Sequence, residues 1–260
     1  MEFSFHKLSN KNYLEKVVLD FKKNGYVIIK NIYDPDEINS LKLVFQNLEK
    51  IAKSKSGDSE TLRHIFSGSN YDDLSNSIFS NVLHRGNDST YDSGMIDVFN
   101  PLTWISQNHP EALLLIERLR SSLIMNIVQH VNPRVKPKTS NLYIHENVHN
   151  PRCLHVDAVR DYFKIFLALS DQTNLGCGPF SVISGSHRNK IRNYLMCVYN
   201  AKIKRSGNPT DASFYSNRSV KHLLLDIGSI AICNQSIVHG AAAAEGPMGK
   251  RLTFVQTFDH

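Results

Sequence analysis

Apolar residues recur with the spacing of one helix face in three stretches of the chain, and we expect helices over 11–24, from Asp34 to Ala52, and over 110–132. The first of these ends at Asn24-Gly25, because glycine readily adopts the left-handed conformation that stops a helix. The second begins with a capping aspartate, followed by a proline at the first helical position.

From residue 139 onward the pattern changes to short apolar runs that are interrupted by Gly, Pro and Asn. Such runs are typical of strands. With one further run after the first helix, we expect strands over 26–30, 140–145, 153–157, 162–169, 180–183, 221–225, 228–233 and 251–258. Many short strands that follow helices indicate an α+β fold, with a double-stranded β-helix (jelly roll, cupin-like) core and N-terminal and mid-chain flanking helices.

Two polar stretches, 53–95 and 200–218, show no sustained period. The first is too long for an ordinary connection between elements. We therefore expect lid or substrate-contacting segments within 53–110 and 200–220. There is no internal repeat, so we expect residues 1–260 to form a single domain.

The composition is that of a globular protein, with 41% hydrophobic and 21% charged residues. No apolar run approaches the roughly 18 residues that a membrane span requires, so we expect no membrane partner. The first residues lack the layout of a signal peptide, and the four cysteines form no C-x-x-C pair. These features predict a cytoplasmic protein with free thiols.

The triplet His155-Val156-Asp157 is a candidate metal site. Residues at i and i+2 of a strand point to the same side, so this imidazole and carboxylate can reach one ion, and His239 would complete the set. Two His and one carboxylate leave coordination positions open, as non-haem Fe(II) oxygenases require.

Arg251 follows His239 by twelve residues (251 − 239 = 12). A buried guanidinium at this place could hold the far carboxylate of 2-oxoglutarate in a two-pronged salt bridge. Asn141 and Tyr143 point toward the same cavity if the strand alternation holds, and we expect them to contact the co-substrate.

Several segments resemble the phytanoyl-CoA dioxygenase family of Fe(II)/2-oxoglutarate oxygenases. They are Gly-Cys-Gly-Pro-Phe-Ser-Val-Ile-Ser-Gly-Ser-His-Arg from Gly176, Asn-Gln-Ser-Ile-Val-His-Gly from Asn234, Arg251-Leu252-Thr253, and the helix, glycine turn and strand over 21–29. The resemblance covers roughly 10–50 and 140–258. It departs from the family at Ser184, where a proline is usual, and at Ala241 to Ala244.

The resemblance implies catalytic iron held by His155, Asp157 and His239. It also implies 2-oxoglutarate and O2 as co-substrates, with Thr253 assisting Arg251, and release of succinate and CO2. The expected reaction is hydroxylation of a small molecule. Related halogenases have Gly or Ala at the place of Asp157, so its carboxylate favours hydroxylation, desaturation or ring closure.

Two other readings compete. His145-Glu146-Asn147-Val148-His149 has the H-E-x-x-H form of a zinc metalloprotease, in which the two histidines lie on one helix. The β-rich residues before it and Pro151 after it oppose a long helix. A jelly-roll binding module without catalysis is the second alternative.

Basic residues flank the first two ligands, and a positive entrance would attract anions. We therefore expect a small anionic substrate, with Arg152 and Arg160 as its contacts. Nucleic acid is not expected, because Thr257 stands where nucleic-acid demethylases of this chemistry carry a second arginine. The oligomeric state is not predicted.

Overall fold

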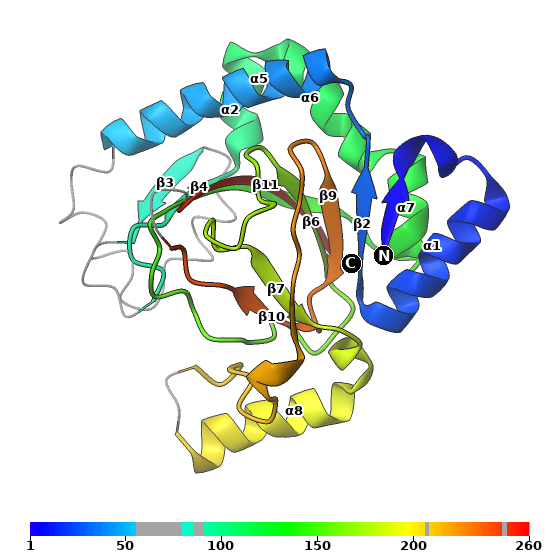
Figure 1. Ribbon diagram of the computed structural model, residues 1–260, viewed down its shortest axis with the longest axis vertical. Helices are drawn as coiled ribbons and strands as arrows, with labels where there is room; N and C mark the ends of the chain where they lie inside the picture. Colours follow the sequence, from blue (N-terminus) through cyan, green and yellow to red (C-terminus); the bar gives the residue numbers. More distant parts are fainter. Residues whose placement is uncertain (56–79, 86–90, 206–207, 246–248, 260) are drawn as a thin grey trace.

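The computed structural model describes residues 1–55, 80–85, 91–205, 208–245 and 249–259. Its framework is a large sheet of eight strands facing a small sheet of three strands (Figure 1). In order across the large sheet, the strands are β1 (Glu2–Ser4), β2 (Tyr26–Lys30), β9 (Ile230–Asn234), β6 (Phe163–Ala168), β11 (Lys250–Asp259), β5 (Lys136–Glu146), β4 (Ile96–Phe99) and β3 (Asn81–His84). The small sheet has the order β10 (Val238–Ala241), β7 (Phe180–Ile183) and β8 (Val220–His222).

Helices cover the outer face of the large sheet, and one further helix lies beyond the small sheet (Figure 1). The α-helices are α1 (Lys11–Asn24), α2 (Pro35–Lys55), α5 (Pro101–Asn108), α6 (Pro110–Glu117), α7 (Ser122–Gln129) and α8 (Lys190–Val198). Single-turn 3-10 helices are η1 (Phe5–Lys7), η2 (Arg118–Arg120), η3 (Ser186–Arg188) and η5 (Asn217–Ser219), and η4 (Tyr199–Ile203) is a π-helix. The arrangement is the predicted α+β jelly roll. None of the helices in the described ranges is long and apolar enough to cross a bilayer.

The alternation of side chains along β5, β6 and β11 divides the molecule into two apolar layers. Leu142, Ile165 and Phe254 point outward and join the core that α1, α2, α6 and α7 cover. Phe166 and Val255 point inward and meet the small sheet. Polar residues on the inward side therefore face the space between the two sheets.

The first helix begins and ends where the sequence predicts, and the second begins there but continues three residues beyond the expected Ala52. The Asn10 side chain accepts a hydrogen bond from the backbone N–H of Tyr13 at 3.1 Å, and Gly25 ends α1 with φ 82°. Asp34 Oδ1 accepts from the N–H of Glu37 at 2.9 Å, while Glu37 Oε2 accepts from the N–H of Asp34 at 3.0 Å. This reciprocal pair is a capping box, which satisfies two backbone donors that the helix itself cannot.

A turn that follows β7 joins the N-terminal helix to the small sheet. Ser186 Oγ donates to Ile183 O at 2.7 Å and accepts from the N–H of Val238 at 2.8 Å. The His187 ring hydrogen-bonds Lys22 O through Nε2 at 3.0 Å. A Cβ on Gly25 would lie 2.5 Å from His187 Nδ1, so only glycine fits there. His187 is therefore a structural residue.

The prediction of one continuous helix over 110–132 is wrong, because the structure has α6, η2 and α7 in this stretch. The helix breaks at η2, and Ser121 is extended with ψ 154°. Arg118 at this break donates to Ile32 O and to the Glu37 carboxylate, and Arg120 donates to Gln256 Oε1. These contacts with distant segments outweigh the local helical preference of the stretch.

The predicted strand over 153–157 is also absent. His155 instead forms isolated bridges with His239 and Asp211, and the residues around it follow no ladder. Elements β1, β3, β4, β10, α5 and α8 were not predicted from the sequence. The expected loop 200–218 contains most of η4, and half of the expected lid segment 53–110, namely 56–79 and 86–90, lies outside the described residues.

Candidate active site

Three side chains converge at one end of the space between the sheets. His155 Nε2 lies 3.3 Å from Asp157 Oδ1, and His239 Nε2 lies 3.6 Å from the same oxygen. One ligand atom from each residue falls within 4.8 Å of the others, close enough to surround a single ion. The backbones of His155 and His239 donate to each other at 2.8 Å in both directions, so main-chain pairing sets the separation of the two rings.

Both imidazoles are oriented for metal binding. His155 Nδ1 lies 2.8 Å from Cys153 O, and His239 Nδ1 lies 2.9 Å from Ile237 O. A carbonyl accepts only, so each Nδ1 carries the proton and each Nε2 keeps a lone pair directed at Asp157. Burial, followed by the neighbouring His239, lowers the pKa of His155, which keeps its ring neutral. The donor set fits a divalent metal with two imidazoles and one carboxylate.

Lys164 of β6 holds the second carboxylate oxygen of this triad. Its Nζ lies 2.6 Å from Asp157 Oδ2. Burial opposes the negative charge on Asp157, but the Lys164 ammonium outweighs it and holds the pKa of Asp157 well below its usual range. Oδ1 is therefore the oxygen left for a metal. Lys164 was not predicted as a site residue, although its place in β6 turns its side chain inward.

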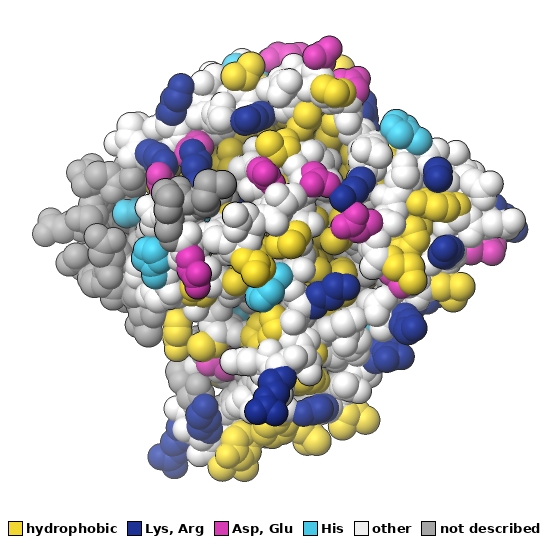
Figure 2. Space-filling model, in the orientation of Figure 1, with side chains coloured by type: hydrophobic (Ala, Val, Ile, Leu, Met, Phe, Trp, Pro, Cys, Tyr) yellow, Lys and Arg dark blue, Asp and Glu magenta, His cyan; other side chains and the backbone are white. Residues whose placement is uncertain are grey.

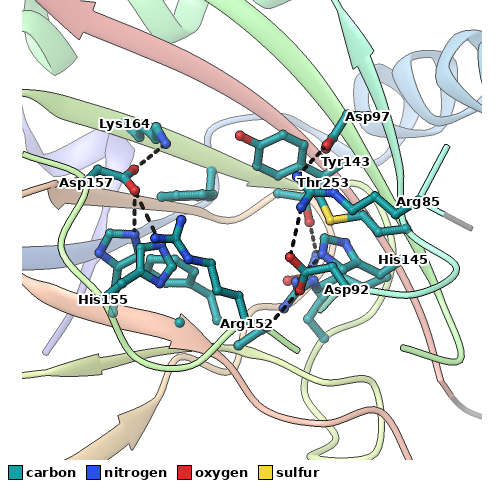
Figure 3. Close-up of a pocket in the computed structure, with 18 of the residues that line it drawn as sticks. Arg85, Asp92, Asp97, Tyr143, His145, Arg152, His155, Asp157, Lys164 and Thr253 are labelled. Atoms are coloured by element: carbon teal, nitrogen blue, oxygen red, sulfur yellow. Dashed lines mark hydrogen bonds and ion pairs between the residues drawn. The ribbon is translucent and has the colours of Figure 1, made fainter. Parts of the chain in front are cut away.

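A solvent-open cavity extends from the triad between the two sheets (Figure 3). Its walls come from β4, β5, β6, β10 and β11, and from loop residues between the strands. Among the residues predicted from the sequence, the triad, Arg251, Thr253, Tyr143 and Arg152 line this cavity. The structure thus brings seven of the nine predicted residues to one place.

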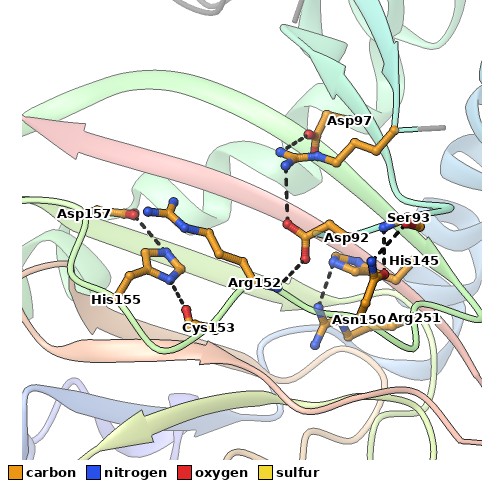
Figure 4. A network of polar contacts seen from close by, with 11 residues as sticks. Asp92, Ser93, Asp97, His145, Asn150, Arg152, Cys153, His155, Asp157 and Arg251 are labelled. Atoms are coloured by element: carbon orange, nitrogen blue, oxygen red, sulfur yellow. Dashed lines mark hydrogen bonds and ion pairs between the residues drawn. The ribbon is translucent and has the colours of Figure 1, made fainter. Parts of the chain in front are cut away.

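Arg251 lies buried on β11 at the wall away from the triad (Figure 4). One terminal nitrogen donates to Gly178 O, and Nη2 donates to His145 Nε2 at 2.9 Å. Thr253 lies two residues after Arg251 on the same face of β11, and its Oγ1 accepts a hydrogen bond from Gln172 Nε2 at 3.0 Å. Burial lowers the pKa of Arg251 to about 10, so it remains charged at neutral pH. Two contacts leave further guanidinium N–H groups for an anion.

His145 acts as the acceptor that orients Arg251. Since a guanidinium can only donate, His145 Nε2 must be unprotonated. Burial, followed by the positive charges of Arg251 and Arg85, holds the pKa of His145 well below its ordinary value. The neutral ring is thus built into the wall of the cavity.

Acid should destabilise the metal-free protein through this ring. Below the ordinary histidine value near 6.5 the unfolded chain takes up a proton that the folded His145 does not. The free energy of unfolding should then fall by up to about 1.4 kcal/mol per pH unit for this residue. When the free energy of unfolding is measured with urea at several pH values between 7 and 5, it should fall less steeply with decreasing pH for His145→Gln than for the wild type. Burial also lowers the pKa of His155 and His187, so part of the slope should remain. Equal slopes in both proteins would contradict the assignment.

An acidic cluster that the sequence analysis did not single out forms the wall opposite the triad (Figure 4). Arg85 binds Asp97 at 3.0 Å and Asp92 at 3.3 Å, and Asp92 Oδ1 accepts from the backbone N–H of Arg152 at 2.9 Å. Burial raises the pKa of Asp97 in spite of the nearby Arg85. Asp97 pairs with Tyr143 across β4 and β5, so strand register brings it to the cavity.

Two of the predicted residues do not line the cavity. Arg160 is 58% exposed and pairs with Asp259 at 2.7 Å, away from the triad. Asn141 is buried on the inward side of β5 but lies beyond the cavity wall. Asn141 thus lies on the predicted side of its strand, but too far along the strand to reach the cavity.

The protease motif does not form a metal site in the described residues. His145 lies on β5 and is bonded to Arg251, while His149 lies on an exposed loop with Nδ1 2.7 Å from Ala244 O. Glu146 pairs with Lys53. The strand ends at Glu146, so the two histidines do not lie one helical turn apart as the zinc-protease motif requires, and the H-E-x-x-H interpretation is wrong.

Comparisons with known proteins agree with this geometry. The family model for phytanoyl-CoA dioxygenase (PhyH) matches residues 21–251. The structure of AviO1 from Streptomyces viridochromogenes Tue57 is similar, with TM-score 0.55, 17% identity, and coverage of 95% of this chain and 94% of that one. The α-ketoglutarate-dependent carbocyclase SnoK has TM-score 0.60, 16% identity and coverage of 96% and 85%.

EctD from S. alaskensis, solved with 2-oxoglutarate and 5-hydroxyectoine, has TM-score 0.56 and 14% identity, with coverage of 94% of this chain and 75% of that one. At these identities the structures establish the fold. No curated protein sequence matches the chain significantly.

Proposed function

Because this chain belongs to the phytanoyl-CoA dioxygenase family, we propose that it hydroxylates a small anionic metabolite with release of succinate and CO2. The predicted class, an Fe(II)- and 2-oxoglutarate-dependent oxygenase, is confirmed, and so are its cofactors. One observation carries the proposal for the site: the His155, Asp157 and His239 ligand atoms converge in the same cavity that Arg251 lines.

Each residue then has a defined task. His155, Asp157 and His239 hold the iron, which supplies the oxidising chemistry when it is bound together with co-substrate and O2. Arg251 and Thr253 bind the far carboxylate of 2-oxoglutarate, because both line the cavity from adjacent inward positions of β11. Tyr143 lies between them and the acidic cluster and completes the wall.

Charge at the cavity supports an anionic substrate. The carboxylates of Asp92 and Asp97 form ion pairs with Arg85, and Lys164 forms an ion pair with Asp157. Arg152 is different: its side chain donates to the Thr210 hydroxyl at 2.9 Å and forms no ion pair with a described residue. Figures 3 and 4 show its guanidinium directed toward the Asp157 end of the cavity. With Arg251 assigned to the co-substrate, Arg152 is the cation left for a substrate carboxylate or phosphate.

Arg152→Ala should raise the KM for the substrate by roughly 30-fold or more, since truncating one partner of a desolvated charge pair costs about 2–5 kcal/mol. The apparent affinity for 2-oxoglutarate should change little. Steady-state kinetics on the identified substrate checks this, with Arg160→Ala as a matched arginine outside the cavity. An uncharged substrate, or equal kinetics for both variants, would remove the anionic assignment.

The substrate itself can be found by succinate release. The protein is incubated with Fe(II), 2-oxoglutarate and fractions of a metabolite extract, and active fractions are analysed by mass spectrometry. Gain of one oxygen atom indicates hydroxylation, whereas loss of two hydrogens indicates desaturation or ring closure. No substrate-stimulated succinate in any fraction, despite iron binding, would favour the alternative of a binding module.

The single domain over 1–260 and the cytoplasmic location remain predictions. The location is supported by Cys153, Cys177, Cys197 and Cys233, which are all free thiols. Strands from residues 2–4 and 250–259 share the large sheet, which supports one domain. The 53–110 and 200–220 segments also remain predicted as substrate-contacting parts. Of these, the described residues 85, 92, 95 and 97 line the cavity, and none from 200–220 does.

A further inference from the structure

Helix α8 and the π-helix η4 that continues it expose an apolar stripe to solvent. Ile191 is 78% exposed, Tyr194 60% and Ile203 70%. Leu195, Val198 and Tyr199 are also exposed. Spacings of three and four residues place the side chains from 191 to 198 on one face of the helix. A surface helix normally turns polar residues outward, so this face is unlike that of an ordinary surface helix.

The stripe is directed outward by firm contacts on the opposite face. Met196 is fully buried against the small sheet. Asn193 donates to Ser236 O at 2.9 Å and accepts from the Tyr215 hydroxyl at 2.6 Å. Asn200 donates to Asp211 O at 2.7 Å. The helix cannot roll its apolar face inward without breaking these buried hydrogen bonds, and each would leave an unpaired polar group.

Positive charge surrounds the stripe. No acidic residue occurs between Asp171 and Asp211 in the sequence. Within that interval, the basic residues are Arg188, Lys190, Arg192, Lys202, Lys204 and Arg205. Lys190 pairs with Asp161, and Arg192 stacks on Tyr215, but none of the other four forms an ion pair with a described residue. Figure 2 shows apolar side chains beside Lys and Arg at the end of the molecule that α8 occupies.

We propose that α8 and η4 dock the protein onto an anionic lipid surface, which departs from the expectation of no membrane partner because that expectation considered membrane-spanning segments alone. Exposed apolar patches of this kind mark interaction sites. Aliphatic and tyrosine side chains bordered by Lys and Arg are the composition of helices that lie in the interface of an anionic membrane. The cations attract lipid headgroups while the stripe enters the boundary with the acyl chains. The contact is peripheral, in keeping with the absence of a spanning helix from the described residues.

A second copy of the chain is a poorer occupant. In a two-fold dimer the same patch meets itself, so the unpaired cations of one copy would lie near those of the other. Like charges brought together in an interface oppose association. An anionic bilayer instead satisfies both the apolar and the basic parts of the surface.

The test is sedimentation with vesicles of phosphatidylcholine alone, or of equal parts phosphatidylcholine and phosphatidylglycerol. Wild-type protein should sediment with the anionic vesicles only, and less at high salt, because salt screens the attraction. The double variant I191S/L195S should bind them at least about tenfold more weakly, since it removes apolar surface without adding charge. Leu114→Ser is the matched control, because Leu114 is 79% exposed on α6, away from the stripe.

A second double variant, K202S/K204S, should lose most of the salt-dependent part of binding. Iron binding by both double variants should equal that of the wild type, which shows that they are folded. No sedimentation with anionic vesicles would overturn the proposal, as would equal loss in Leu114→Ser. A lipid-free dimer that dissociates in I191S/L195S would overturn it in favour of a second copy.

Discussion

Replacing His239 with alanine is expected to weaken Fe(II) binding by about 100-fold or more. Loss of the groups that merely orient metal ligands typically costs 10- to 100-fold, and His239 is itself a ligand in our assignment. Its ring is buried and its Nε2 is directed at Asp157, so no other described side chain can take its place without moving the backbone. Titration of the metal-free protein with Fe(II) under anaerobic conditions measures the effect.

His149→Ala provides the matched control. This histidine belongs to the H-E-x-x-H sequence but lies on an exposed loop outside the triad. Its loss should leave iron affinity unchanged. If His239→Ala keeps its affinity for Fe(II) while His149→Ala loses it, the metal is bound by the histidines of the H-E-x-x-H sequence, and the assignment of the triad is contradicted.

Arg251→Ala should raise the concentration of 2-oxoglutarate needed for half-maximal turnover by roughly 30-fold or more. The guanidinium is buried, and truncation of one partner in such a pair costs about 2–5 kcal/mol because the other charge is left unpaired. Arg251→Lys should restore only part of the affinity, since an ammonium cannot reproduce a planar two-pronged contact. His145 would also lose its hydrogen-bond donor in the alanine variant.

Arg160→Ala again serves as the control, because it removes an exposed arginine of equal charge. Iron binding in Arg251→Ala should stay normal, which separates loss of the co-substrate contact from loss of fold. If the 2-oxoglutarate requirement is unchanged in Arg251→Ala, another residue binds the co-substrate, and Lys164 is the next cation to replace.

Local patterns predicted elements that are stabilised locally. Helices α1 and α2 match because Gly25 and the Asp34 capping box fix their ends within a few residues. Strand β7 matches its predicted limits, 180–183. Strands β4 and β10 were missed because no local pattern marks them. Their pairing with distant strands creates them.

The site residues divide in the same way, into those that local sequence patterns reveal and those that the pairing of distant strands brings to the site. The triad and Arg251 were found through residue type and spacing, and Thr253 through the family resemblance. Lys164, His145 and Asp97 belong to the cavity through strand register, which brings Asp97 opposite Tyr143 and His145 opposite Arg251. Register between strands 46 or 106 residues apart cannot be deduced from one chain (143 − 97 = 46; 251 − 145 = 106).

The last described strand, β11, lies in the middle of the large sheet, between β6 and β5. During synthesis both neighbours are therefore complete long before their shared partner leaves the ribosome. Their inner edges stay open in the nascent chain, and open edges are templates for aggregation. A truncation that removes 250–259 deletes a central strand and not an edge strand of the sheet. The edges of β6 and β5 would then stay unpaired in the finished protein, and we expect it to aggregate.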